Sequence, residues 1–134
     1  MPYQEPYIRM LVLDPHQPSR QVLLYYLQQH NMAGCEAATL DEAKARFNEF
    51  LIQAVAFQCP LPDVAFLDVV DWLCHSPPEG RQLYVLAITS MPEVYTPHVL
   101  LQEGANDCLA KPVSGDDVRE AFSRMRSALK LNCS

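Results

Sequence analysis

Three short and almost wholly apolar runs constrain the fold of this chain more than any other feature. They lie at residues 9–13, 52–57 and 83–88. Runs of this length without polar alternation are typical of parallel strands that are covered on both faces. The segment after the first run carries apolar residues at helical spacing, namely Val22, Leu23, Tyr26 and Leu27. We therefore predict an α/β fold in which a parallel sheet lies between two layers of helices.

Capping and turn residues place the remaining elements. Pro18 suits the first turn of a helix over 18–30, because that position needs no backbone N–H. Thr39 and Glu42 have the spacing of a capping box. The helix that they open carries Ala43, Phe47 and Leu51. We also predict strands at 35–38 and 107–110, a short helix over 97–103, and a last helix from Ser114 to Leu129.

Length and composition indicate one domain. The chain has 134 residues, of which 49% are apolar. This is enough for one domain with a buried core and too little for two domains of ordinary size. We assign residues 9–130 to that domain, residues 1–8 to a flexible leader and residues 131–134 to a tail.

Charge and cysteine content exclude several classes of protein. The formal net charge is −6, whereas direct nucleic-acid binding normally needs a basic patch. The five cysteines are odd in number and have no metal-ligand spacing, so we expect reduced thiols. No signal-peptide layout and no apolar run of membrane-spanning length is present in the sequence. We expect a cytoplasmic protein without direct nucleic-acid or membrane contacts.

Polar motifs follow several of the predicted strands. The first strand ends in Leu13-Asp14, the fourth in Ile88-Thr89-Ser90, and the segment from Gly104 ends in Leu109-Ala110-Lys111-Pro112. In order and spacing these motifs resemble the receiver domain of two-component response regulators, the CheY-like family, over nearly the whole chain. The resemblance implies a flavodoxin-like, doubly wound (βα)5 fold with five parallel strands in the order 2-1-3-4-5.

The resemblance also implies roles for individual residues. In receivers an aspartate accepts a phosphoryl group, acidic side chains bind magnesium, and a lysine and a hydroxyl hold the phosphoryl oxygens. Asp14 matches the first acid of the metal-binding pair, Thr89 the hydroxyl and Lys111 the lysine. The motif further implies a cis peptide bond between Lys111 and Pro112. A local hydrogen bond to the backbone is the alternative role for the Thr89 hydroxyl.

Two positions depart from the family pattern. Pro15 replaces the second acid, and Gln58 stands where the phosphoacceptor aspartate is expected. An amide oxygen is too weak a nucleophile for phosphoryl transfer, and one carboxylate is a poor ligand set for magnesium. His16 is either a substitute ligand or a solvated loop residue. We interpret the chain as a degenerate receiver with no enzymatic activity and weak or absent magnesium binding, in which Lys111 pairs with Asp14 and hydrogen-bonds Gln58.

Asp68 is the alternative phosphoacceptor, because residues 62–68 also look like the third strand of a receiver. However, 14 residues separate Asp68 from Leu83, and the prolines among them break a helix. A parallel crossover needs a dozen or more residues, usually with a helix. The polar residues Asp68, Asp71 and His75 have helical spacing, and Asp63 can cap that helix. These features favour Gln58 at the end of the third strand.

Two signalling functions follow from these alternatives. The favoured function is a phosphorylation-independent interaction or regulatory module that binds a protein partner or effector domain, or forms a homodimer. Its candidate surface combines the fourth helix, fifth strand and fifth helix, and includes Met91, Val94, Tyr95, His98, Cys108, Val113 and Arg124. Each of these residues also fits an ordinary half-buried position, and Cys108 fits a small buried hydrophobe. The alternative is a working receiver that is phosphorylated at Asp68.

A third class, an enzyme or ligand-binding domain on a flavodoxin-like sheet, has little support in the sequence. Residues 14–18 after the first strand contain no glycine, although a phosphate-binding loop needs glycines there. No Ser/His/Asp or Cys/His arrangement stands out.

Overall fold

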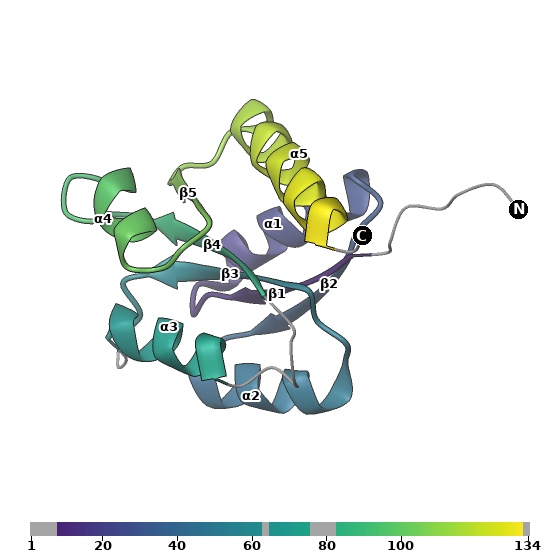
Figure 1. The fold of residues 1–134 in the computed structure, drawn as a ribbon, viewed down its shortest axis with the longest axis horizontal. Coiled ribbons are helices and arrows are strands. Elements are labelled where there is room, and N and C mark those ends of the chain that lie inside the picture. Colours follow the sequence, from purple (N-terminus) through teal and green to yellow (C-terminus); the bar gives the residue numbers. More distant parts are fainter. Residues whose placement is uncertain (1–7, 63–64, 76–82, 133–134) are drawn as a thin grey trace, which may run out of the picture.

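The computed structural model describes residues 8–62, 65–75 and 83–132. Five parallel strands form one sheet in the order β2-β1-β3-β4-β5, which confirms the predicted fold class and strand order (Figure 1). The strands are β1 (Arg9–Leu13), β2 (Ala33–Ala37), β3 (Ala54–Cys59), β4 (Tyr84–Thr89) and β5 (Asp107–Ala110). The helices are α1 (Gln17–Gln29), α2 (Leu40–Glu49), α3 (Phe66–His75), α4 (Pro97–Gln102) and α5 (Gly115–Asn132).

The sheet separates two hydrophobic clusters. Residues of α1 and α5, such as Leu27 and Phe122, pack on one face of the sheet. Residues of α2, α3 and α4, such as Ala43 and Leu100, pack on the other face with Phe57 of β3. All six residues of β3 and of β4 are buried, as expected for central strands that are covered on both sides.

The helix starts follow the predicted capping residues. Pro18 lies in the first turn of α1. At α2 the Glu42 backbone N–H donates to Thr39 Oγ1 at 3.2 Å, and the Glu42 carboxylate accepts from the Ala38 N–H at 2.7 Å. Leu51, in contrast, does not belong to α2, which ends at Glu49, and the Leu51 side chain is 56% exposed.

The strand boundaries shift by up to two residues from the predicted ones. β2 runs from Ala33 to Ala37, because its backbone starts to pair with β1 at Arg9. β3 continues past Phe57 through Gln58 and Cys59, which pair with the last two residues of β4. The apolar run therefore ends before the strand does.

Asp68 lies in α3 and not in a strand. Asp68 and Asp71 are exposed, whereas Val69 and Leu73 are buried at 0% and 2% exposure. This is the amphipathic pattern that the sequence predicts for a helix in this segment. The proposed cap Asp63 and the side chain of His75 lie outside what the structure describes.

The ends of the chain are described in part. Residues 1–7 of the predicted leader and residues 133–134 of the tail lie outside the described residues. Ile8 is buried, and its carbonyl accepts the Ala33 N–H at 2.9 Å. Among the described helices, none has the length and hydropathy to cross a membrane.

Candidate functional site at the carboxyl ends of the strands

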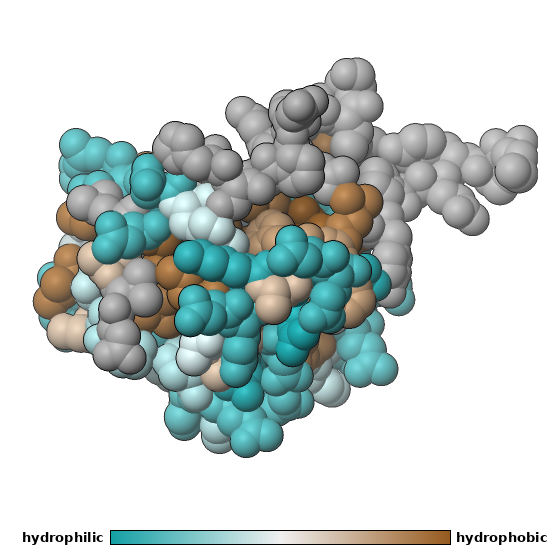
Figure 2. Space-filling view, turned by 90° about the horizontal axis from the view of Figure 1, so that it is seen from below, coloured by the Kyte–Doolittle hydropathy of each residue, from teal (hydrophilic) through white to brown (hydrophobic). Residues whose placement is uncertain are grey.

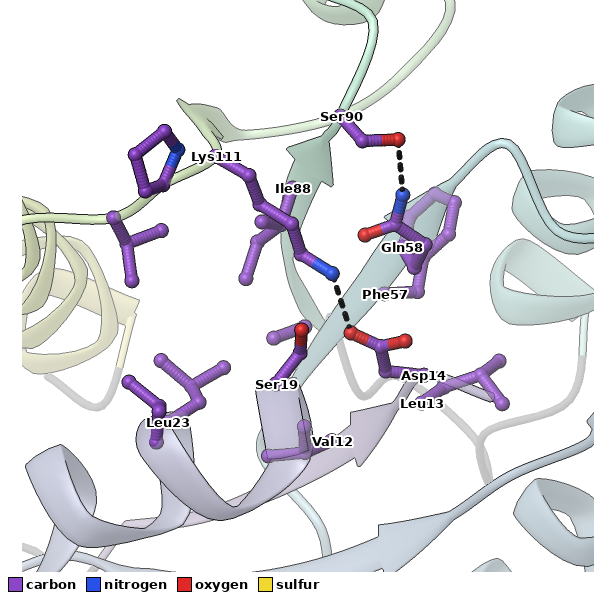
Figure 3. Close-up of a pocket in the computed structure, with 14 residues that line it drawn as sticks. Val12, Leu13, Asp14, Ser19, Leu23, Phe57, Gln58, Ile88, Ser90 and Lys111 are labelled. Carbon is purple, nitrogen blue, oxygen red and sulfur yellow. Dashed lines mark hydrogen bonds and ion pairs between the residues drawn. The ribbon is translucent and has the colours of Figure 1, made fainter. Parts of the chain in front are cut away.

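Four polar residues meet where the strands end. Asp14 follows β1, Gln58 lies near the end of β3, Ser90 follows β4 and Lys111 follows β5. Each of them lies two positions after a residue that packs under α1 and α5. Because side chains alternate along a strand, all four point to the same face of the sheet. The sheet thus gathers polar groups from four strands at one edge, as Figure 3 shows.

Asp14 and Lys111 form an ion pair. Lys111 Nζ lies 2.8 Å from Asp14 Oδ2, and the two side chains are 22% and 9% exposed. The other carboxylate oxygen, Oδ1, accepts the backbone N–H of His16 at 2.9 Å. The expected pairing is confirmed, and both oxygens of Asp14 are engaged by donors of the protein itself.

Gln58 does not form the predicted hydrogen bond with Lys111. Its amide nitrogen donates instead to Ser90 Oγ at 2.9 Å and to the Cys59 carbonyl at 3.3 Å (Figure 3). That part of the prediction is wrong: within the residues that the structure describes, the lysine ammonium binds only the charged carboxylate of Asp14, which is a stronger acceptor than a neutral amide oxygen. The Gln58 side-chain oxygen is buried and accepts no hydrogen bond from the described residues.

Thr89 has the local role that was the alternative to a switch hydroxyl. Its hydroxyl accepts the Met91 backbone N–H at 2.9 Å, and the residue is 2% exposed. The neighbouring Ser90 lines the pocket in its place. The sequence analysis missed this role of Ser90. Strand alternation could have found it, since Ser90 shares a face with Ile88 and Thr89 does not.

The cis peptide bond predicted between Lys111 and Pro112 is present. A second cis bond joins Cys59 and Pro60, just after Gln58. The sequence analysis did not predict this second cis bond.

The ligand set at this edge does not fit magnesium. Among the described residues that line the site, Asp14 is the only acid, and Pro15 lies beside it in place of a second carboxylate. His16 is exposed, and its Nδ1 lies 2.7 Å from Ser19 Oγ. The described part of the chain has no group of three or more His, Cys, Asp or Glu residues that could hold a metal ion. A hard dication prefers several free oxygen ligands, and this site offers none that is both charged and unpaired.

A pocket of about 420 Å³ opens behind the polar residues. It extends from Asp14, Gln58 and Lys111 toward α1 and the turn after β5. Apolar side chains, among them Leu23 of α1 and Val113 of the turn, form its walls. Asp68 does not line this pocket.

The predicted partner residues fall into three groups. Met91 and Val94 are 39% and 54% exposed, and His98 is exposed as well. Tyr95 and Cys108 pack against the core under α4. The remaining two residues make specific contacts: Val113 lines the pocket, and Arg124 donates to Asp107 at 2.7 Å.

Two further exposed apolar residues, Val99 and Leu101, extend the first group along α4. We call Met91, Val94, Val99 and Leu101 the α4 surface. Figure 2 shows apolar atoms at the left edge of the molecule, the side on which α4 lies in Figure 1.

The surroundings of the three cysteines at the sheet disfavour the thiolate form. Burial raises the pKa of the Cys59 thiol to about 12 and that of the Cys35 thiol to about 11. Burial and the nearby Asp107 carboxylate also raise the pKa of Cys108. These surroundings favour the protonated thiol, whereas a reactive cysteine needs a thiolate.

Comparisons with known proteins agree with this fold. The family model described as the response regulator receiver domain matches residues 10–123. A CheY-like receiver domain from Methanospirillum hungatei superposes with a TM-score of 0.78 at 19% identity, covering 95% of this chain and 99% of that one. The receiver domain of a putative LuxO repressor from Vibrio parahaemolyticus gives 0.80 at 21% identity, with 95% of both chains covered.

A third solved structure, the beryllofluoride-activated NtrC4 receiver domain dimer, gives a TM-score of 0.77 at 22% identity, covering 90% of this chain and 97% of that one. Comparison with curated proteins gives no significant match. The family match spans most of the sheet and its helices. The chain therefore belongs to the response regulator receiver family.

Proposed function

We propose that this receiver domain signals without accepting phosphate and acts as a protein-interaction or regulatory module. The observation that carries the proposal is the place of Gln58. Its side chain occupies the pocket beside Lys111, where a receiver needs a carboxylate nucleophile. An amide cannot form the acyl phosphate by ordinary nucleophilic attack.

The ion pair of Asp14 and Lys111 supports the same proposal. A phosphoryl oxygen would compete with Asp14 for the Lys111 ammonium, and a metal ion would compete with the two donors that already bind the Asp14 carboxylate. Breaking a largely buried pair of opposite charges is costly. The arrangement is consistent with a domain that keeps one conformation, with weak or absent magnesium binding and no enzymatic activity.

We propose the α4 surface as the contact for a protein partner, an attached effector domain or a second copy of the chain. Its four apolar residues are between 37% and 54% exposed. The NtrC4 receiver in the comparisons is a dimer, which is a precedent within the family for self-association. Because the net charge is −6, we propose that neither nucleic acid nor a membrane is a direct partner. We also propose a cytoplasmic location.

Incubation with acetyl phosphate and magnesium, followed by intact-mass measurement, tests the phosphate-independent function. We expect no mass increase of one phosphoryl group in the wild-type chain. A phosphoryl adduct that disappears in Asp68→Ala and persists in Asp71→Ala would establish the alternative, a working receiver with Asp68 as acceptor. An adduct that persists in both variants would also contradict the proposal and would move the search to another nucleophile.

A further inference from the structure

We propose that the pocket between α1 and the turn after β5 binds an uncharged small molecule with an apolar body and one hydrogen-bond donor. The donor would bind the side-chain oxygen of Gln58. This inference goes beyond the proposed interaction function and does not depend on it.

The size and the walls of the pocket suit an organic molecule. A volume of about 420 Å³ lies in the range of about 300–1,000 Å³ that small-molecule pockets occupy. Val12, Leu23, Ala56, Ile88 and Val113 form apolar walls from both the sheet and the elements above it. Val22 on α1 also lines the pocket and is 44% exposed, so its side chain lies at the entrance. These walls favour an apolar body over a sugar or a phosphate.

Gln58 supplies the polar anchor. The residue is 8% exposed, and its Oε1 accepts no hydrogen bond from any described residue. The amide nitrogen is already bound to Ser90, which fixes the side chain so that the oxygen stays on the side of Lys111 (Figure 3). A buried carbonyl oxygen without a donor is unfavourable, so an N–H or O–H group of a molecule in the pocket would stabilise this atom by a hydrogen bond.

The charges at the polar end favour a neutral molecule. Lys111 is the one cation and Asp14 the one anion among the described residues that line the pocket, and they lie 2.8 Å apart. An anionic ligand would have to compete with Asp14 for Lys111, and a cationic ligand with Lys111 for Asp14. A hydroxyl or amide group has no such competitor at Gln58.

Three naphthalene derivatives of similar size test the proposal in the 134-residue chain. 2-Naphthol carries a neutral donor, 2-methoxynaphthalene has the same rings without a donor, and 2-naphthoate is an anion at pH 7. Binding is followed by chemical-shift changes in ¹H–¹⁵N NMR spectra. We expect 2-naphthol to shift the amide signals of Val22, Gln58 and Val113, and to bind roughly three- to tenfold more tightly than 2-methoxynaphthalene. We expect 2-naphthoate to bind most weakly. Absence of 2-naphthol binding at millimolar concentration, or equal affinity for all three compounds, would overturn the proposal.

Two variants and a matched control locate the site. Gln58→Met removes the acceptor at similar volume, so we expect it to lower 2-naphthol affinity to that of 2-methoxynaphthalene. Val22→Trp fills the entrance from an exposed position and should weaken both compounds at least tenfold. Val99→Trp on α4 is the control, because Val99 is 37% exposed and does not line the pocket.

Unchanged binding in Val22→Trp, or equal losses in Val22→Trp and Val99→Trp, would place the molecule elsewhere and overturn the proposal. If Gln58→Met does not fold, the Val22 and Val99 pair still decides the location. Neither readout depends on phosphorylation or on a protein partner, so failure of this proposal and failure of the proposed function are separate results.

Discussion

The pocket and the α4 surface differ in where their side chains find partners. In the pocket the charged groups of Asp14 and Lys111 bind each other, and the Gln58 amide binds Ser90. On the α4 surface Met91, Val94 and two neighbours expose apolar side chains to solvent. Apart from Gln58 Oε1, these polar groups of the pocket are bonded within the domain, whereas the apolar side chains of the surface can gain from an outside contact. We therefore expect changes in the pocket to alter the stability of the domain, and changes on the α4 surface to alter its association.

The largest expected effect comes from Lys111→Met. The substitution leaves the 9%-exposed Asp14 carboxylate without its cation, which should lower the free energy of unfolding by about 3 kcal/mol. Urea denaturation at pH 7 measures this loss. The double variant Asp14→Asn/Lys111→Met should recover most of the stability, because it leaves no unpaired charge. A loss in Lys111→Met of under about 0.5 kcal/mol, the size typical of an exposed ion pair, would mean that the pair does not stabilise the fold.

Alkaline pH should destabilise the domain through Cys59, which lies beside Gln58 on the opposite face of β3. Its pKa is about 12 in the fold and 9.0 as the ordinary value, so above pH 9 the unfolded chain loses the proton first. The contribution of Cys59 to the free energy of unfolding is complete below pH 9 and should fall by about 1.4 kcal/mol per pH unit between pH 9 and 12.

Urea denaturation of the wild type and of Cys59→Ala at pH 7 and pH 10.5 tests this. The alanine variant should lose about 2 kcal/mol less than the wild type between the two pH values. Equal losses in both proteins would assign the pH dependence to other groups, such as Tyr84, whose pKa burial and Asp107 raise to about 12.

Ser90→Ala should have a smaller effect. It removes the acceptor of the Gln58 amide, and we expect a loss of about 1 kcal/mol in the free energy of unfolding. Ser123→Ala on the exposed side of α5 is the matched control and should change stability by under about 0.5 kcal/mol. A loss in Ser90→Ala no greater than that of the control would show that the Gln58 amide finds another acceptor.

The smallest effect on stability is expected from Val94→Asp on the α4 surface. Because Val94 is 54% exposed, the free energy of unfolding should change by under about 0.5 kcal/mol. Self-association, measured by analytical ultracentrifugation, should weaken. Tyr25→Asp on α1 is the control, since Tyr25 is 57% exposed and lies outside the α4 surface. Equal effects of both variants would contradict a specific role of that surface. If the wild-type chain stays monomeric at high concentration, self-association is excluded, and the partner of the surface must be a different protein.

The sequence predicts the fold well because its signals are local. Apolar runs mark the central strands, and capping residues such as Thr39 mark the helix starts. Boundaries are predicted less well where tertiary pairing extends a strand. Gln58 and Cys59 belong to β3 because they pair with β4, and no apolar pattern extends over them.

The site is predicted only in part, because some of its contacts depend on tertiary packing rather than on local sequence signals. The motif places Asp14 and Lys111 together, since a charged pair at adjacent strand ends is a strong and specific contact. Which neighbour the Gln58 amide selects depends on side-chain reach, which spacing along the chain does not give. The pocket volume depends on how far α1 lies from the sheet, and this distance results from packing across the whole domain.

Val113 lines the pocket and also belongs to the connection from β5 to α5. If a molecule in the pocket displaces Val113, a protein that contacts the same turn would bind with a different affinity. Such coupling is reciprocal: the factor by which the small molecule changes the affinity for the partner equals the factor by which the partner changes the affinity for the small molecule. If the domain does not accept phosphate, as we propose, it would in this way still respond to a chemical signal.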